Sequence, residues 1–276
     1  MDVSVTYLSP HLDDAVLSCG GLIRQQVLNG ARVTVITIFA GRPIHHELSP
    51  FAASLHAHWG SEDEMVSERR REDQSAMESL GARTYHLDYH DAIYRSDGGQ
   101  YLYACERDLF GHIHPSEVAL ANEVARSISN LFSPGVSSLY APLGVGNHVD
   151  HQVVAAAALA FRPQAGRLTF YEDYPYVERP GALTRRLEDL REARWSAELQ
   201  PLTVGCIEAK IEAISAYQSQ LSSLFGGPEG MKLRITEYAR AICPSDGLAE
   251  RYWRPLPRSI QDPQAKADGL EAVGLL

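Results

Sequence analysis

The N-terminal segment constrains the fold most, because it reads as a strand, a helix and a second strand in close succession. Residues 3–8 form a short apolar run, and residues 32–39 (RVTVITIF) are β-branched and apolar in the manner of a buried strand. Between them, residues 15–28 carry apolar side chains at helical spacing and end at Asn29-Gly30, which is typical of a helix C-terminus. This order predicts a βαβ unit with parallel strands and a right-handed crossover.

The same alternation of helices and strands continues to about residue 175. We expect further helices at residues 62–80, 116–131 and 151–161, and further strands at residues 84–87, 137–141 and 167–171. Beyond them the pattern loosens, although residues 209–221 and 231–242 still favour helices. The chain is therefore predicted to be α/β, with a Rossmann-like, doubly wound and mostly parallel sheet that has helices on both faces.

No internal repeat or flexible linker divides the chain into two domains. We expect residues 1–255 to form a single domain and residues 256–276 to form a polar C-terminal tail. Residues 41–60 and 88–114 are irregular in pattern and rich in His and Tyr. Long loops in a compact α/β domain usually surround the active site, so we expect both segments to lie there.

The overall composition excludes several classes of protein. The 276 residues include 35 acidic and 25 basic side chains, and a chain with a formal charge of −10 repels nucleic acids and anionic lipids. The start of the chain does not resemble a secretory signal, and the longest apolar stretch, residues 153–161, is too short to span a bilayer. The four cysteines form no CxxC pair. We expect a cytoplasmic protein with reduced thiols that acts on a small molecule; the sequence does not indicate its oligomeric state.

Two groups of histidines and carboxylates follow predicted strands. The first, PHLDD at residues 10–14, follows the first strand, and the second, HVDH at residues 148–151, lies just beyond the strand at residues 137–141. In a parallel sheet, ligands bind beyond the carboxyl ends of the strands. A catalytic zinc ion typically takes three imidazole or carboxylate ligands and keeps one position for water. Together the two groups therefore predict a metal centre at this edge of the sheet.

The residue types within the two groups suit different tasks. Neighbouring side chains leave an extended backbone on opposite sides, so one of Asp13 and Asp14 can bind a metal while the other removes a proton from water. In HVDH one histidine can bind the metal while the other points at the substrate, and Asp150 can hold an imidazole in one tautomer. Taken singly, the first group could be no more than a helix N-cap and the second a polar loop.

PHLDD and HVDH together resemble the LmbE/PIG-L family of zinc-dependent N-acetyl deacetylases and amidases, whose motifs read (A/P)HxDD and HxDH. Two further stretches are similar to family motifs. Arg69 opens R-x-x-E-x-x-x-A-x-x-x-L-G, and Lys210 opens K-x-x-A-x-x-x-(Y/H)-x-S-Q. The resemblance covers residues 3 to about 220. It departs at Ala15, where the family usually has a glutamate that is not a metal ligand, so the expected metal site is unaffected.

The resemblance implies which residues form the metal centre and the base. His11, Asp14 and His151 would hold Zn²⁺, although Fe²⁺, Co²⁺ and Ni²⁺ also suit such ligands. Asp13 would be the general base that activates the attacking water.

The resemblance also implies how the rest of the site would act. His148, oriented by Asp150, would stabilise the oxyanion and help to protonate the leaving amine, and Arg69 would contact the sugar. Polar and aromatic side chains after two other strands are further candidates for substrate contacts: Asp91, Tyr94, Arg95, Glu172 and Tyr174. An ordinary polar turn explains any one of these five equally well, and Arg69 could instead pair with Asp73 one helical turn away. The remaining histidines in irregular segments are expected to be loop or lid residues: His45, His46, His56, His58, His112 and His114.

These observations predict a zinc-dependent hydrolase that removes the acetyl group from an N-acetylglucosamine-type sugar conjugate and releases acetate. One alternative is an amidase that cleaves a thiol–sugar conjugate or another N-acyl amide, and a second is a non-catalytic sugar-binding protein on the same fold. The chain has no GxGxxG motif after its first strand and no GxSxG motif, which argues against a dinucleotide-dependent dehydrogenase and a serine hydrolase.

Overall fold

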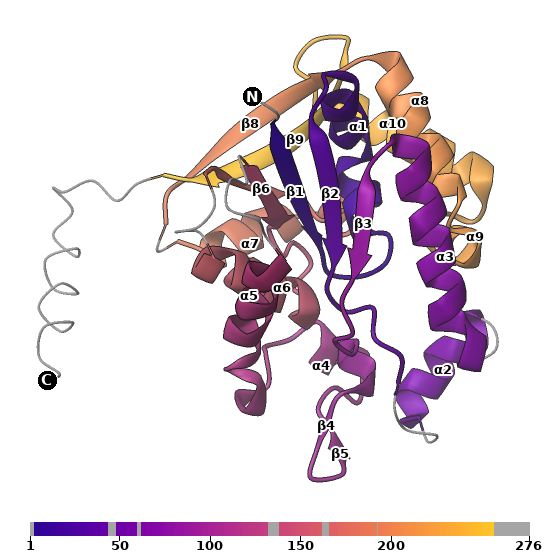
Figure 1. Cartoon of the computed structure of the whole chain (residues 1–276), viewed down its shortest axis with the longest axis vertical. Coiled ribbons are helices and arrows are strands. Elements are labelled where there is room, and N and C mark those ends of the chain that lie inside the picture. Colours follow the sequence, from indigo (N-terminus) through magenta and orange to yellow (C-terminus); the bar gives the residue numbers. More distant parts are fainter. Residues whose placement is uncertain are drawn as a thin grey trace, which may run out of the picture.

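A seven-stranded sheet with the order β3-β2-β1-β6-β7-β9-β8 forms the centre of the protein (Figure 1). The structure is a computed structural model and describes residues 3–43, 48–59, 62–131, 138–161, 166–191 and 193–256. Five strands pair in parallel: β1 (Ser4–Ser9), β2 (Arg32–Thr37), β3 (Arg83–His86), β6 (Ser138–Pro142) and β7 (Leu168–Tyr171). The strand order reverses between β1 and β6, and ligands bind at such a switch point in open α/β sheets.

Helices cover both faces of the sheet because the central strands are apolar on both sides. In β2, Val33 and Val35 pack into one hydrophobic cluster, whereas Ile36 packs into the other, as the alternation of side chains along a strand requires. The first cluster includes side chains of α1 (Asp14–Leu28), α3 (Glu62–Leu80), α8 (Val204–Ser215), α9 (Gln218–Phe225) and α10 (Pro228–Ala241). The second includes those of α5 (Leu120–Leu131), α6 (Val149–Phe161) and α7 (Ala182–Asp189). Figure 1 shows the two groups of helices on opposite sides of the sheet.

A third, smaller cluster packs beyond the carboxyl ends of the strands. It contains apolar side chains from α2 (Pro50–Trp59), the 3₁₀ turn Ala92–Tyr94 and α4 (Glu106–Leu109). These elements occupy the two segments for which we expected irregular loops, and the short hairpin of β4 (Ser96–Asp97) and β5 (Gln100–Tyr101) extends from the second. The expectation of structureless loops was therefore wrong, because local apolar residues fold these segments into a cap above the sheet edge.

The strands and helices expected before residue 175 are present, but the C-terminal part differs. The expected helix at residues 209–221 is two helices, α8 and α9, which are separated at Ala216-Tyr217. Two strands were not expected: β8 (Trp195–Leu202) and β9 (Leu248–Pro255), which pair antiparallel at the edge of the sheet. Both are rich in polar and half-exposed residues, so they lack the apolar run of the parallel strands. Residues 257–276, most of the expected tail, lie outside the described residues.

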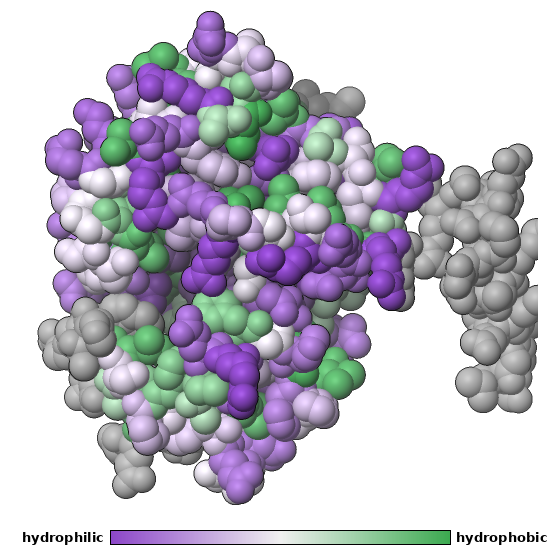
Figure 2. All heavy atoms as spheres, turned by 180° about the vertical axis from the view of Figure 1, so that it is seen from behind, coloured by the Kyte–Doolittle hydropathy of each residue, from purple (hydrophilic) through white to green (hydrophobic). Residues whose placement is uncertain are grey.

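None of the helices in the described part of the chain is both long and apolar enough to cross a bilayer. On the face opposite to that of Figure 1, strongly hydrophilic side chains run across the middle of the molecule, and apolar side chains gather only in small separate groups (Figure 2).

Candidate active site

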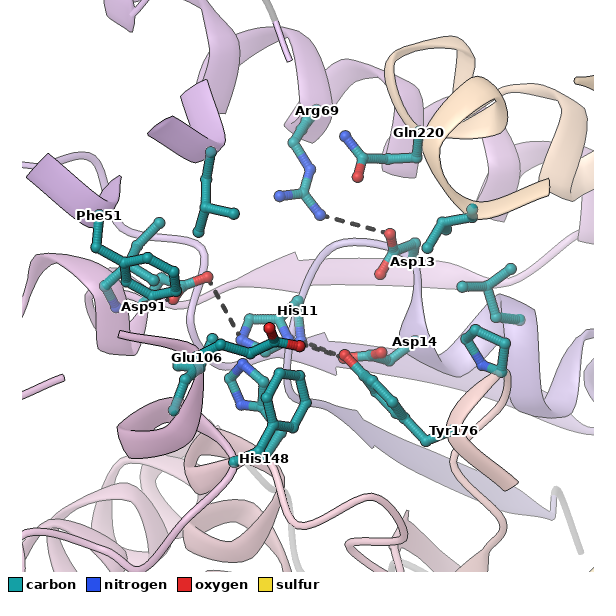
Figure 3. A pocket seen from close by; sticks show the side chains of 17 residues that line it. His11, Asp13, Asp14, Phe51, Arg69, Asp91, Glu106, His148, Tyr176 and Gln220 are labelled. Carbon is teal, nitrogen blue, oxygen red and sulfur yellow. Dashed lines mark hydrogen bonds and ion pairs between the residues drawn. The ribbon is translucent and has the colours of Figure 1, made fainter. Parts of the chain in front are cut away.

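A cavity of about 370 Å³ opens beyond the ends of β1 and β6. His11, Asp13 and Asp14 enter it from the segment after β1, Arg69 from α3, and His148 from the segment after β6 (Figure 3). Both groups of histidines and carboxylates therefore meet at one edge of the sheet, where the strand order reverses.

A tight turn after β1 sends the two neighbouring aspartates in different directions. The Ser9 hydroxyl donates to the His11 carbonyl (2.7 Å) and accepts from the Ala15 N–H (3.0 Å), which folds the turn back on itself. Asp13 adopts φ 142° and makes no capping hydrogen bond to α1, so the simple N-cap explanation of this motif is wrong. Asp14 begins the helix instead, and its carboxylate faces His11 and His151.

His11, Asp14 and His151 form a compact group of possible metal ligands whose donor atoms lie within 4.8 Å of one another. Asp14 Oδ2 is 3.1 Å from His11 Nδ1 and 3.3 Å from His151 Nε2. The Nε2 atom of His151 is buried and makes no hydrogen bond within the described part of the chain. Burial alone would lower the pKa of His151, but Asp14 and a neighbouring carboxylate outweigh it and raise the pKa to about 9. The group therefore favours positive charge at its centre, which a divalent cation would supply.

Asp173 fixes the orientation of His151, although sequence analysis did not identify it as a site residue. Its Oδ1 accepts from His151 Nδ1 (2.6 Å), and its Oδ2 accepts from the peptide N–H groups of Gly144 (2.8 Å) and Val145 (2.7 Å). With Nδ1 as the donor, Nε2 keeps the lone pair that a metal needs. The only sequence signal was the position of Asp173 two residues after the end of β7.

Asp150 has a different partner from the one we expected. Its fully buried carboxylate contacts His11 Nε2 (3.0 Å), the Ala92 N–H (3.0 Å) and Arg95 Nη1 (2.5 Å), so it orients His11 and not His148. Burial opposes ionisation, but Arg95 and His11 hold the pKa of Asp150 well below its usual range. His11, His148 and Asp150 form a second possible ligand group. This group is less suited to a metal, because His11, the Ala92 N–H and Arg95 already occupy both oxygens of Asp150.

His148 is set up as a neutral hydrogen-bond donor. Its Nδ1 accepts from the peptide N–H of Asp150 (3.2 Å), which leaves Nε2 to carry the hydrogen. Burial, and then the nearby His11, lower the pKa of His148 well below its usual value. The expected interaction with Asp150 therefore runs through the backbone at the start of α6 and not through the carboxylate.

Asp13 and Arg69 face each other on the other side of the cavity. Arg69 Nη2 lies 3.2 Å from the Leu12 carbonyl and 3.4 Å from Asp13 Oδ2. Burial raises the pKa of Asp13 to about 7, although Arg69 opposes this shift. Burial acts on Asp14 in the same direction, but His151 and His11 outweigh it and hold the pKa of Asp14 well below the usual value. Arg69 does not pair with Asp73, because His86, Thr84 and Tyr217 take up that carboxylate.

The two remaining sequence motifs meet beside Arg69. Glu72, one turn along α3, accepts from the N–H (2.8 Å) and the hydroxyl (2.6 Å) of Ser219 and so positions the start of α9. Gln220 then lines the cavity next to Arg69 and Asp13 (Figure 3). Lys210 is buried away from the cavity and pairs with Glu250 (2.8 Å).

Of the five further candidates for substrate contacts, only Asp91 lines the active-site cavity. Asp91 lines the cavity, with Oδ2 3.5 Å from His11 Nε2, whereas Tyr94 lines a separate small cavity that shares His11, Arg69 and Asp91 with it. Arg95, Glu172 and Tyr174 do not line the cavity, so the structure does not support the prediction that they touch the substrate. Arg95 pairs with Asp150 and Glu117, Glu172 accepts from Arg251 and Trp253, and Tyr174 packs against Phe225.

None of the other histidines that the structure describes joins the metal group. His56 is buried and bonds to the Tyr94 hydroxyl (2.6 Å), and His114 accepts from the N–H of Ser116. His45, His46 and the side chain of His58 lie outside the described residues. The cavity also contains residues that sequence analysis did not assign to the site, most of them apolar: Leu17, Phe51, Leu55, Ile93, Glu106, Leu109, Phe110, Pro175, Tyr176 and Leu224.

Comparison with known proteins identifies the family. A family described as PIG-L, GlcNAc-PI de-N-acetylase, matches residues 6–161, which is more than half of the chain. The chain belongs to the PIG-L family. The match includes both groups of histidines and carboxylates and Arg69, so the family predicted from the sequence is confirmed.

Relatives within the PIG-L family are deacetylases. The 2'-N-acetylparomamine deacetylase of Niallia circulans is 29% identical over 242 residues, which cover 80% of this chain and 82% of the relative. That of Streptomyces fradiae is 31% identical over 219 residues, which cover 77% and 72%. The zinc-inhibited form of a teicoplanin deacetylase has a TM-score of 0.79 at 29% identity and covers 94% of this chain and 100% of its own. The predicted fold and the predicted class of enzyme, an amide-hydrolysing deacetylase, are confirmed.

Proposed function

We propose that this PIG-L protein is a zinc-dependent N-deacetylase that hydrolyses the acetamide of an amino sugar within a larger conjugate. The observation that carries the proposal is the divergence of the two neighbouring aspartates. Asp14 joins two histidines in a group suited to a cation, and Asp13 faces the open cavity with a pKa near neutrality. One turn of backbone thus supplies both a metal ligand and a base.

His11, Asp14 and His151 would hold the metal ion. A bound Zn²⁺ supplies Lewis acidity, which lowers the pKa of water toward about 7 and polarises the amide carbonyl. The buried, unbonded Nε2 of His151 and the orientation of both imidazoles by Asp150 and Asp173 support this assignment. The zinc-inhibited form of the teicoplanin deacetylase shows that a relative binds zinc, and the same ligand types also accept other divalent ions.

The chain's own residues would carry the proton and the developing charge. Asp13 would accept a proton from the attacking water, and its pKa of about 7 suits it to return that proton to the leaving nitrogen. Arg69 would hold the Asp13 carboxylate in place. The Nε2–H of His148 would donate to the carbonyl oxygen as negative charge develops there; the neutral imidazole can do so because its Nδ1 accepts from the Asp150 N–H and its hydrogen is on Nε2.

The shape and lining of the cavity support a small glycoside as substrate. Its volume of about 370 Å³ lies in the usual range for small-molecule sites, about 300–1,000 Å³. Carboxylates and histidines line it together with apolar side chains that include Phe51, Leu55 and Phe110, and Phe110 packs edge-on against His148. The names of the relatives, which act on N-acetylparomamine and teicoplanin, favour an amino-sugar-containing natural product.

We further place the enzyme in the cytoplasm. All four cysteines, Cys19, Cys105, Cys206 and Cys243, are free thiols in the structure. Unpaired thiols are typical of proteins in a reducing compartment, which supports this location.

The decisive experiment measures acetate released from N-acetylparomamine and from a panel of N-acetylglucosaminides. We expect release by the wild type and a loss of about 10²–10⁴-fold in Asp13→Asn, whereas the exposed control Asp97→Asn should match the wild type. Release of a different acid would favour the amidase alternative. Binding of these sugars by a metal-loaded protein that hydrolyses none of them would favour a sugar-binding protein and refute the proposal.

A further inference from the structure

A second hollow of about 280 Å³ lies beside the active-site cavity and is lined by three arginines. Arg179 follows the 3₁₀ turn Tyr176–Glu178, and Arg185 and Arg186 lie on α7. Asp189 is the only acidic residue among those that line the hollow. In a chain with a net charge of −10, such a concentration of positive charge is a local exception.

The carboxylates near these arginines act at longer range: Asp173 and Asp189 only partly offset the effect of burial on the pKa of Arg186. Within the part of the chain that the structure describes, none of the three guanidinium groups forms an ion pair. Arg179 stacks over the rings of Phe110 and Tyr176, at 5.4 Å from each centroid, and Arg186 Nε donates to the Leu143 carbonyl (2.8 Å). Arg185 makes only a 3.4 Å contact with the Pro180 carbonyl. These neutral contacts position the guanidinium groups but leave most of their N–H donors for a ligand.

The backbone is shaped to admit the arginines. Gly144 has φ 84°, and a Cβ at this position would lie 2.8 Å from Nη2 of Arg186. The absence of that side chain lets the guanidinium lie against the loop that leads to His148. Burial lowers the pKa of Arg186, so an anion beside it would stabilise its charged form.

The hollow and the active-site cavity share a wall. Phe110 lines both, and Arg179 stacks on Phe110 and Tyr176, two aromatic residues that line the cavity. A conjugate whose sugar occupies the cavity therefore has to cross only this wall to reach the arginines.

We propose that this arginine pocket, formed by Arg179, Arg185 and Arg186, binds an anionic group, a carboxylate or a phosphate, on the aglycone of the substrate. Guanidinium groups bind both anions through paired hydrogen bonds. The inference rests on the proposed function, because it assumes that an amino-sugar conjugate enters the cavity. The charges would also orient the conjugate, since the three arginines attract its anionic group to the pocket beside the cavity.

The test uses N-acetylglucosaminides with flexible alkyl aglycones of increasing length that end in a carboxylate or a phosphate, each compared with the carboxamide of equal length. In the wild type we expect kcat/KM for the best charged substrate to exceed that for its carboxamide by about tenfold, as for one charge-assisted hydrogen bond. Arg185→Gln and Arg179→Gln should move this ratio toward unity. Arg191→Gln removes the same charge from an exposed arginine outside the pocket and should preserve it.

The outcomes separate the pocket from the reaction. If acetate is released but the wild-type ratio is near unity, or if both pocket variants keep the wild-type ratio, the arginine pocket is refuted while the deacetylase proposal stands. If no glycoside releases acetate, the deacetylase proposal fails for this class of substrate. Calorimetric titration of the protein with the carboxylate glycosides then tests the arginine pocket separately. If the wild type binds these glycosides and Arg185→Gln binds them more weakly, the pocket is supported. If the wild type does not bind them, the pocket is refuted.

Discussion

Replacing Asp173 by asparagine should disable the side chain that fixes the tautomer of His151. The fully buried carboxylate accepts three hydrogen bonds, one from His151 Nδ1 and two from the peptide N–H groups of Gly144 and Val145. An asparagine of the same shape has one acceptor oxygen and one donor group, so it can serve either the peptides or the imidazole but not both.

The two orientations of the amide have different costs. If its NH₂ group faced the peptides, two buried N–H groups would lose their acceptor, at about 1–3 kcal/mol each. The oxygen should therefore stay with Gly144 and Val145, and the NH₂ group should donate to His151 Nδ1. The imidazole proton then moves to Nε2, the atom that we assign to the metal. Loss of such a supporting contact typically weakens metal binding about 10–100-fold, which is about 1.4–2.8 kcal/mol.

Zinc affinity in competition with a chromophoric chelator would test this reasoning, with urea denaturation as a check on folding. Asp173→Asn should bind zinc at least about tenfold more weakly than the wild type. Asp97→Asn, on the exposed β4–β5 hairpin, makes the same chemical change away from the cavity and should bind normally. If Asp173→Asn binds zinc as tightly as this control, Asp173 does not set the tautomer and His151 is not held as we describe.

Three further substitutions test other parts of the site. Asp13→Asn should keep its metal, as measured by elemental analysis; a metal-free protein would show that the roles of the two aspartates are exchanged. Arg95→Ala should lower the free energy of unfolding by about 3–5 kcal/mol in urea denaturation, because it leaves the buried Asp150 carboxylate without its cation; a change below about 1 kcal/mol would contradict this. Gly146→Ala should destabilise the fold by about 1–3 kcal/mol and raise KM, since Gly146 has φ 90° and a Cβ there would lie 2.6 Å from that of Tyr176. An unchanged KM would show that Tyr176 does not shape the substrate site.

The parallel core could be predicted because its signals are local. The runs at residues 3–8 and 32–39 are apolar on both faces, and only a strand buried between two layers of helices requires that pattern. The edge strand β8 alternates between half-exposed and exposed residues and contains Pro201, so its pairing with β9 depends on tertiary contacts that no local pattern shows.

The metal group was predictable for a related reason, since its ligands lie in two short segments that each directly follow a strand. The supporting residues were not. Asp173 lies 22 positions from His151 in the sequence, and Asp150 reaches His11 across 139 positions. Glu172 and Asp173 are adjacent carboxylates at one strand end, and we selected Glu172 from the sequence, although Asp173 is the one that reaches the site. The segment after β7 turns Asp173 toward His151 and Glu172 toward Arg251, and only this tertiary arrangement separates their roles.

The backbone of Asp13 has a consequence for the stability of the whole protein. A residue other than glycine at φ 142° costs about 1–3 kcal/mol, and the carboxylate is buried as well. Asp13→Gly should therefore be inactive yet more stable; the lost contact with Arg69 offsets only part of the gain, because Arg69 keeps the Leu12 carbonyl. In urea this would appear as a higher midpoint with an unchanged slope. Selection for heat resistance alone would thus tend to remove the base, so an aspartate at this position reflects selection for catalysis against the preference of the fold.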